Sequence, residues 1–243
     1  MKSGGRGGTA VPAAIKGEEK RMKRAISFAE GKWNPSEWMT VKSTRWEYVH
    51  GFKQCADYIV NESGDWSDEE LYAHHVTEVY SSIVLKEKLR GKCRVSSTMS
   101  FDHLMAPIIV VAPVLGQSAD GKHPEFRRHH EIVLYKDGIN IWRYIWDGHQ
   151  VIWTLAAFLR RPFEPGRKYE LAVTVEAYKD TRRMTVECDG HVLGYADDAL
   201  ELDNYVGVTG AFCAFGFGKL KDSRVTVKIN RFEELLRHLK AED

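Results

Sequence analysis

Two Asp-Gly dipeptides, Asp137-Gly138 and Asp147-Gly148, constrain this chain more than any other feature of its sequence. Each dipeptide separates runs of β-branched and aromatic residues. This is the strongest short-range signal for a two-residue hairpin turn, because Asp and Gly tolerate the positive φ angles of a type I′ turn. The sequence therefore predicts three consecutive antiparallel strands between Arg127 and Phe158.

The two turns also predict which side chains share a face of the sheet. With residues 137 and 138 as the first turn, Lys136 pairs with Ile139 and Glu131 pairs with Tyr144. Side chains alternate along a strand, so the pairing sorts them into two sets. One face collects Ile132, Leu134, Ile139, Ile141 and Ile145, and the other collects His129, Glu131, Tyr135, Asn140, Trp142, Tyr144 and Trp146. The first face is the predicted core.

The second face combines aromatic rings with imidazoles, an amide and a carboxylate. The second turn would place Trp146 opposite His149 and Trp142 opposite Trp153. Sugars stack their C–H faces on aromatic rings and need both hydrogen-bond donors and acceptors. We therefore predict that the following residues bind a carbohydrate: Trp142, Tyr144, Trp146, Trp153, Asn140, His149 and Arg143. The alternative is that these aromatics pack under a loop or a second sheet, since large aromatics are usually buried.

Catalysis on a sugar would need a proton donor or acceptor beside these rings. Glu131 is the best placed carboxylate, with His129 and Tyr144 in phase beside it. Neighbouring rings remove water from a carboxylate, which raises its pKa and suits general acid catalysis. We predict Glu131 and His129 as the catalytic pair, with a plain surface carboxylate as the alternative for Glu131. A glycosidase also needs a second carboxylate, for which the sequence offers only Glu176, Glu187 and Asp102.

A polysaccharide lyase would use different groups from the same stretch. His129 or Tyr144 could act as the base, and Asn140 or Arg143 could neutralise a uronate. The pairing turns Arg143 toward the apolar face, where a charged group needs a partner. An internal salt bridge is therefore an equal interpretation of Arg143.

Composition excludes several classes of function. The formal net charge is +1, from 35 basic and 34 acidic residues, which gives no reason to expect nucleic acid or an anionic membrane as a partner. No long apolar run or secretory signal is present, so we expect a cytoplasmic protein. The four cysteines are far apart and predict reduced thiols, with two disulfides between distant positions as the alternative. The histidines form no metal-binding motif, so no cofactor is expected. A structural calcium ion is the alternative to this expectation.

Both ends of the chain differ from the middle. Residues 1–24 contain seven Lys or Arg against two Glu and are rich in Gly, which predicts a mobile basic arm. Packing of this arm along a neighbouring subunit would make a homo-oligomer. In residues 230–243, Asn230 can cap a helix and Phe232, Leu235, Leu236 and Leu239 recur at helical spacing. We therefore predict a C-terminal amphipathic helix, docked on the main domain of residues 25–229.

The many short strands, with turn signals every eight to twelve residues, predict an all-β sandwich or jelly roll. Within it, residues 116–130 read as a long loop that could close over a ligand. Three runs carry a resemblance to a known superfamily: F-x-P-G-R-K-Y-E-L-A-V-T-V-E from Phe163, R-M-T-V-E-C-D-G-H-V-L-G-Y from Arg183, and V-G-V-T-G-A-F-C-A-F-G-F from Val206. They resemble the back half of concanavalin A-like lectin/glucanase jelly rolls.

The resemblance spans roughly Ser81 to Lys228 and implies a concanavalin A-like jelly-roll β-sandwich. The layout is similar to the YesU-like proteins associated with pectin-derived sugars. Jelly rolls of this superfamily often hold a structural calcium. Two departures bear on activity. The E-x-D-x-E or E-x-D-x-x-E strand of laminarinase-type glycosidases is missing. The nearest sequence is Glu187-Cys188-Asp189, which runs into a hairpin turn that we predict at Asp189-Gly190. The R-x-E-x-R and Q-[IV]-H strands of jelly-roll alginate lyases are missing as well.

Two functions therefore compete. The first is an intracellular enzyme that cleaves glycosidic linkages of a plant-derived oligosaccharide or glycoside, by hydrolysis or elimination, on an aromatic-lined concave sheet. The second is a non-catalytic carbohydrate-binding or structural assembly subunit. Catalysis predicts titratable groups that converge in one pocket, whereas binding predicts an open aromatic surface.

Overall fold

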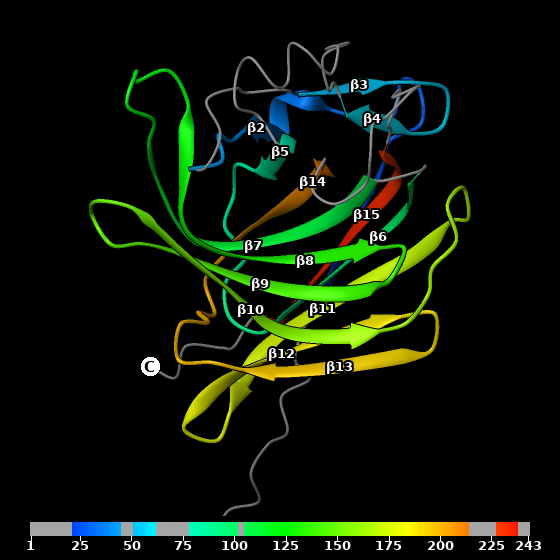
Figure 1. Ribbon diagram of the computed structural model, residues 1–243. Helices are drawn as coiled ribbons and strands as arrows, with labels where there is room; N and C mark the ends of the chain where they lie inside the picture. The colour runs from blue at the N-terminus through cyan, green and yellow to red at the C-terminus, as the bar shows by residue number, and fades with distance from the viewer. Residues whose placement is uncertain (1–20, 45–50, 62–77, 102–104, 214–226, 238–243) are drawn as a thin grey trace, which may run out of the picture.

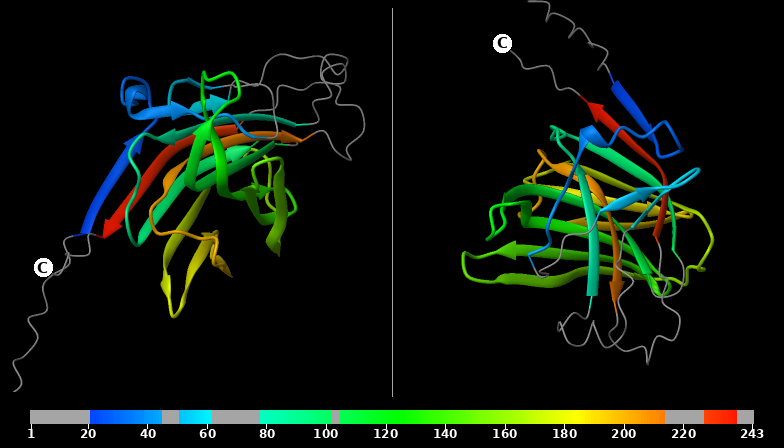
Figure 2. Two further views of the ribbon diagram at one scale, coloured as in Figure 1. Left: turned by 90° about the vertical axis from the view of Figure 1, so that its left-hand side faces the viewer. Right: turned by 90° about the horizontal axis from the view of Figure 1, so that it is seen from above.

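The computed structural model describes residues 21–44, 51–61, 78–101, 105–213 and 227–237. The described strands form two antiparallel sheets that pack face to face (Figure 1, Figure 2). Sheet A has the order β13 (His191–Ala196), β12 (Thr181–Cys188), β11 (Tyr169–Tyr178), β6 (Cys93–Phe101), β15 (Val227–Arg237), β4 (Ile59–Asn61) and β3 (Phe52–Gln54), and β1 (Arg21–Ser27) also pairs with β15. Sheet B has the order β10 (Val151–Arg160), β9 (Gly138–Trp146), β8 (Pro124–Tyr135), β7 (Met105–Gln117), β14 (Tyr205–Cys213), β5 (Glu78–Leu85) and β2 (Trp38–Thr40).

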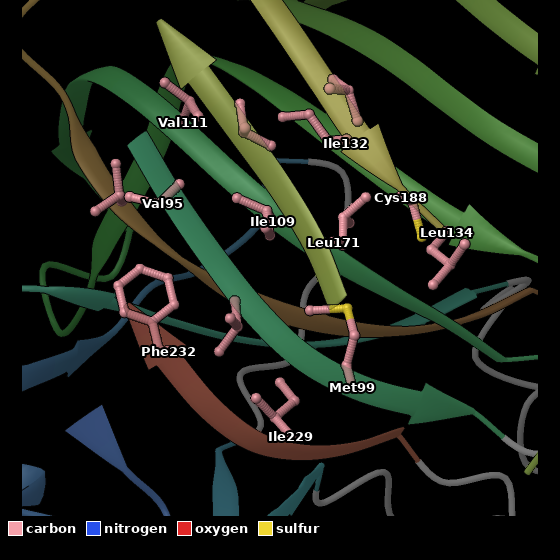
Figure 3. Close-up of a cluster of buried hydrophobic side chains, with 14 of the residues drawn as sticks. Val95, Met99, Ile109, Val111, Ile132, Leu134, Leu171, Cys188, Ile229 and Phe232 are labelled. Atoms are coloured by element: carbon pink, nitrogen blue, oxygen red, sulfur yellow. The ribbon is translucent and has the colours of Figure 1, made fainter. Parts of the chain in front are cut away.

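The core lies between the two sheets. Figure 3 shows Ile109, Val111, Ile132 and Leu134 of sheet B facing Val95, Met99, Leu171 and Phe232 of sheet A. Ile132, Leu134, Ile139 and Ile141 have no exposed surface, as the predicted apolar face requires. Fully burying one such side chain stabilises the fold by about 1.5–3 kcal/mol. The all-β sandwich predicted from the sequence is therefore confirmed.

The turn between β8 and β9 differs from the prediction, but each side chain lies on the face of the sheet that was predicted for it. Lys136 and Asp137 form the turn, and Gly138 is already the first residue of β9, opposite Tyr135. The pairing is consequently shifted by two residues, so that Glu131 lies opposite Trp142 instead of Tyr144. An even shift leaves every side chain on its predicted face.

Of the other two predicted turns, the one between β9 and β10 differs from the prediction and the one at Asp189-Gly190 agrees with it. Between β9 and β10 the chain uses residues 147–150, and the Asp147 carboxylate accepts backbone hydrogen bonds from His149 and Gln150, each 2.8 Å long. At Asp189-Gly190 the predicted two-residue turn is present, with φ angles of 49° and 77°. It places Cys188 directly opposite His191.

Both predicted appendages are corrected where the structure describes them. Residues 230–237 are not helical, because they belong to β15, which pairs with β6 on one side and with β1 on the other. Residues 21–24 of the predicted arm form most of β1, which runs beside β15 in Figure 2. Two sheet neighbours satisfy the backbone of β15, and this outweighs the helical spacing of its apolar residues. Residues 1–20 and 238–243 lie outside the described chain.

Residues 116–130 are also not a long loop. β7 continues to Gln117 and β8 begins at Pro124, so the two strands form an extended hairpin. Among the described residues, the only helical segment is the 3-10 turn Pro35–Glu37, and no helix there is long and apolar enough to cross a membrane.

Candidate functional site

The predicted sugar-binding aromatics gather on the outer face of sheet B, away from the core. Trp142, Tyr144 and Trp146 alternate along β9, and Trp153 of β10 lies opposite Tyr144. The rings of Trp142 and Trp153 are 5.4 Å apart between centroids. We call Trp142, Tyr144, Trp146 and Trp153 the aromatic platform. The structure thus brings four of the seven predicted binding residues together, in the face that the hairpin alternation predicts.

The members of the aromatic platform differ in exposure. Trp153 is 45% exposed, whereas Tyr144 is only 4% exposed. Trp142 and Trp146 are half-buried. The guanidinium of Arg127 lies over the Trp146 ring, 4.9 Å from its centroid, a cation–π contact that orients the indole. The accessible part of the platform is therefore its edge along β10.

The predicted catalytic pair lies beside the platform and is buried. Nε2 of His129 and Oε1 of Glu131 are 3.2 Å apart. The imidazole is stacked between Phe126 and Tyr144, with both ring centroids 4.5 Å away. His129 is 1% exposed and Glu131 is 3% exposed. A ligand resting on the platform therefore does not reach either group without a movement of the surrounding side chains.

Part of the outer face of sheet B is covered by the chain itself. Residues 41–43, the roof segment, leave the edge strand β2 and reach the start of β8. The Val41 amide donates to the Ser82 carbonyl at 3.0 Å, and the Lys42 amide donates to the Pro124 carbonyl at 2.8 Å. Val41 packs in an apolar cluster with Val84, Ile108, Val110, Ala112, Phe126 and Val133. Figure 1 shows the β7–β8 hairpin rising toward β2, where the roof segment meets it.

Val41 of the roof segment packs against Val84 of β5 and against Ile108 and Val110 of β7, and all four side chains are buried. The exposed aromatic surface of this face lies at Trp153 on β10. No local pattern in the sequence indicates this crossing, because it is an isolated parallel bridge between Lys42 and Glu125, which are far apart in the chain. Salt bridges from Glu125 to Lys42 (3.0 Å) and to Arg127 (2.9 Å) reinforce it.

The other three predicted binding residues are not part of the aromatic platform. Asn140 is half-buried on the outer face, opposite Val133. His149 is exposed in the turn between β9 and β10, not opposite Trp146. Arg143 faces the other sheet, where its Nε lies 3.4 Å from the Asp197 carboxylate. The internal salt bridge is thus the interpretation of Arg143 that the structure favours.

The proposed second carboxylates do not join Glu131. Glu176 and Glu187 lie on β11 and β12 of sheet A, whereas Glu131 is on β8 of sheet B. Glu176 pairs with Lys92 and Arg183, and these contacts hold its pKa below the usual value. Glu187 pairs with Arg94. Asp102 lies outside the described residues.

Possible metal ligands and cysteine thiols both occur in the part of the chain that the structure describes. No group of three or more His, Cys, Asp or Glu residues there is arranged to hold a metal ion. Cys55, Cys93 and Cys188 are free thiols. Burial raises the thiol pKa of Cys93 and of Cys188 to about 12, so both are inert as nucleophiles near neutral pH.

Comparison with known proteins identifies the fold. No family model and no curated protein sequence matches this chain. Among solved structures, the κ-carrageenase from Pseudoalteromonas carrageenovora, in complex with an oligotetrasaccharide, is 11% identical with a TM-score of 0.55, over 95% of this chain and 100% of that chain. The β-glucanase of Bacillus licheniformis is 8% identical with a TM-score of 0.55, over 87% and 97%. The Emp47p carbohydrate recognition domain is 11% identical with a TM-score of 0.52, over 88% and 95%.

These likenesses establish the architecture. The fold is a concanavalin A-like jelly roll, as the resemblance of the sequence indicated. At identities this low, the comparisons carry the fold alone.

Proposed function

We propose that the protein binds carbohydrate on the outer face of sheet B, through the aromatic platform. The observation that carries this proposal is the pair of indoles at the open edge of that face. Trp153 is 45% exposed and packs 5.4 Å from Trp142 between ring centroids. An exposed indole held against a half-buried one offers the apolar surface on which a pyranose ring stacks. Structural neighbours that are a carbohydrate recognition domain and an enzyme bound to an oligosaccharide support the same class of ligand.

Binding fits the site better than cleavage does. A general acid must touch the glycosidic oxygen, whereas Glu131 is 3% exposed and already contacts His129. Hydrolysis by the usual route also requires a second carboxylate within about 10 Å. The candidates Glu176 and Glu187 are on the other sheet and engaged in salt bridges.

The charges around the platform favour an uncharged sugar. Arg143, the predicted partner of a uronate, is turned inward to Asp197. Arg127, which contacts Trp146, also bonds the Glu125 carboxylate at 2.9 Å and the Gln117 carbonyl at 2.7 Å. A guanidinium already held by a carboxylate has little attraction left for an anionic ligand. Neutral hexose or pentose oligomers are therefore the expected ligands.

The test is a binding measurement on a panel of neutral and acidic oligosaccharides, followed by calorimetry on the best ligand. Trp153→Ala and Trp142→Ala should each weaken binding by roughly tenfold, the effect of losing about 1.4 kcal/mol of ring stacking. Tyr178→Ala is the matched control, because Tyr178 is an exposed aromatic (38%) on sheet A. Unchanged affinity in both Trp variants, or equal loss in the control, would contradict the proposal.

A glycosidase is the second candidate, and the buried His129–Glu131 pair favours it. A carboxylate 3.2 Å from an imidazole, beside a ring platform, is an arrangement that can move a proton. Turnover of aryl glycosides and oligosaccharides by the purified protein tests this function. If the protein is an enzyme, Glu131→Gln should abolish turnover and keep affinity. If the protein only binds sugar, no turnover appears and Glu131→Gln changes affinity less than twofold.

A further inference from the structure

Exposed apolar side chains concentrate on one strand of the molecule. Of the seven large hydrophobic residues exposed in the described chain, four lie on β10: Ile152 (49%), Trp153 (45%), Leu155 (48%) and Phe158 (38%). They project from both faces of the sheet. Ile152 lies opposite Ile145 on the inner face, whereas Trp153 lies opposite Tyr144 on the outer face. A sugar bound on the outer face does not account for the exposed side chain of Ile152 on the inner face.

β10 is also the edge of sheet B. In the described part of the chain, β9 is its sole sheet neighbour (Figure 1). An edge strand presents a row of backbone donors and acceptors, and proteins usually protect such edges with Lys, Pro or a short strand. β10 has ten residues, and no charged residue or Pro occurs between Val151 and Leu159. Both its backbone edge and its side chains are therefore suited to another strand.

We propose that a second copy of this chain adds to β10 in the antiparallel direction, about a two-fold axis between Leu155 and Ala156. The bulge at Ala156 makes Trp153 and Phe158 share the outer face, and Ile152 and Leu159 the inner face. In this register Trp153 meets Phe158 of the second copy, and Ile152 meets Leu159 of the second copy. Each large side chain gains an apolar partner on its own face, the pairing that stabilises antiparallel strands.

The charges at the two ends of β10 are complementary in the same register. One end follows the exposed Asp147 turn, and the other carries the exposed Arg160 and Arg161. None of the three is in a salt bridge with the residues that the structure describes. An antiparallel second copy brings the Asp147 turn beside Arg161 and places Gln150 directly opposite Arg161. Opposite charges at both ends of the interface favour this orientation over a parallel one.

The first test is the mass of the full chain by light scattering and sedimentation over a concentration series. The protein as it stands should dimerise, and Ile152→Lys should raise the dissociation constant at least about tenfold, since it places a charge in a buried contact. Val192→Lys is the matched control, because Val192 is an aliphatic residue 61% exposed on the other edge strand, β13. A chain that stays monomeric throughout, or equal weakening by both variants, overturns the proposal.

A second test reads the register. Gln150→Glu should tighten the dimer and Gln150→Lys should weaken it, because both act on Arg161 of the second copy. Under mild oxidation, Leu155→Cys should give a covalent dimer and Val192→Cys should not. Equal effects of the two Gln150 variants, or equal cross-linking at both positions, refute the two-fold arrangement. Dimer formation at β10 does not depend on sugar binding, and Ile152 lies off the platform.

Discussion

The buried side chain of His130 should make the free energy of unfolding of this protein fall in mild acid. Its side chain has no exposed surface, and neither ring nitrogen has a hydrogen-bond partner among the residues that the structure describes. It lies opposite Arg143 on the inner face of sheet B, with the Tyr195 ring 5.8 Å away. Burial lowers the pKa of His130 from 6.5 to about 4, and the positive charges of Arg143 and Arg128 act in the same direction, while Asp197 opposes them.

The sign and size of the effect follow from these two pKa values. The unfolded chain takes up a proton near pH 6.5, whereas the folded chain does so only near pH 4. The free energy of unfolding is therefore at its full value above pH 6.5 and falls as the pH drops toward 4. Linkage gives a loss from this residue of about 2 kcal/mol at pH 5 and about 3 kcal/mol at pH 4.

The variant His130→Leu isolates this contribution. At pH 7 its stability should be within about 1 kcal/mol of the parent protein, because a buried group without a hydrogen bond is replaced by an apolar one of similar size. At pH 5 the variant should be the more stable protein by roughly 2 kcal/mol. Urea denaturation at both pH values measures the difference, with His149→Leu in the exposed turn as control. Equal losses in His130→Leu and the parent between pH 7 and pH 5 would refute the reasoning.

Three further predictions test the fold. Leu171→Ala, in the centre of the core with no exposed surface, should lower the free energy of unfolding by about 2–5 kcal/mol in urea. Gly138→Ala should cost more stability than Gly190→Ala by the same measurement, since a Cβ at Gly138 would meet the Leu159 carbonyl oxygen at 2.2 Å, while nothing lies within 4 Å at Gly190. Alkylation at pH 8, followed by mass spectrometry, should label the half-buried Cys55 well before Cys188, whose buried thiol has a pKa of about 12. Equal costs of the two Gly variants, or faster labelling of Cys188, would contradict the described packing.

Local sequence determined the strands and their faces. The alternation of Ile139 and Ile141 with Trp142 and Tyr144 has a period of two, and only a β-strand with one buried face matches that period. The prediction of faces survived a register error of two residues, because an even shift keeps each side chain on its side. Asp189-Gly190 was predicted correctly for a similar reason, since both residues adopt the positive φ angles that the turn needs.

Contacts between distant segments decided the structure of the C-terminal residues and the exposure of the candidate site. The spacing of apolar residues predicted a helix from Asn230 onward. The strand β15 forms there instead, because its backbone pairs with β6 and β1, and no local sequence pattern indicates that pairing. The roof segment at Val41, the inward salt bridge of Arg143 and the burial of Glu131 all depend on chain that arrives from elsewhere in the sequence. Side-chain alternation is a property of a single strand, so the sequence alone carries it. Whether a given face is open or covered depends on which remote residues pack over it, and only the assembled fold determines that.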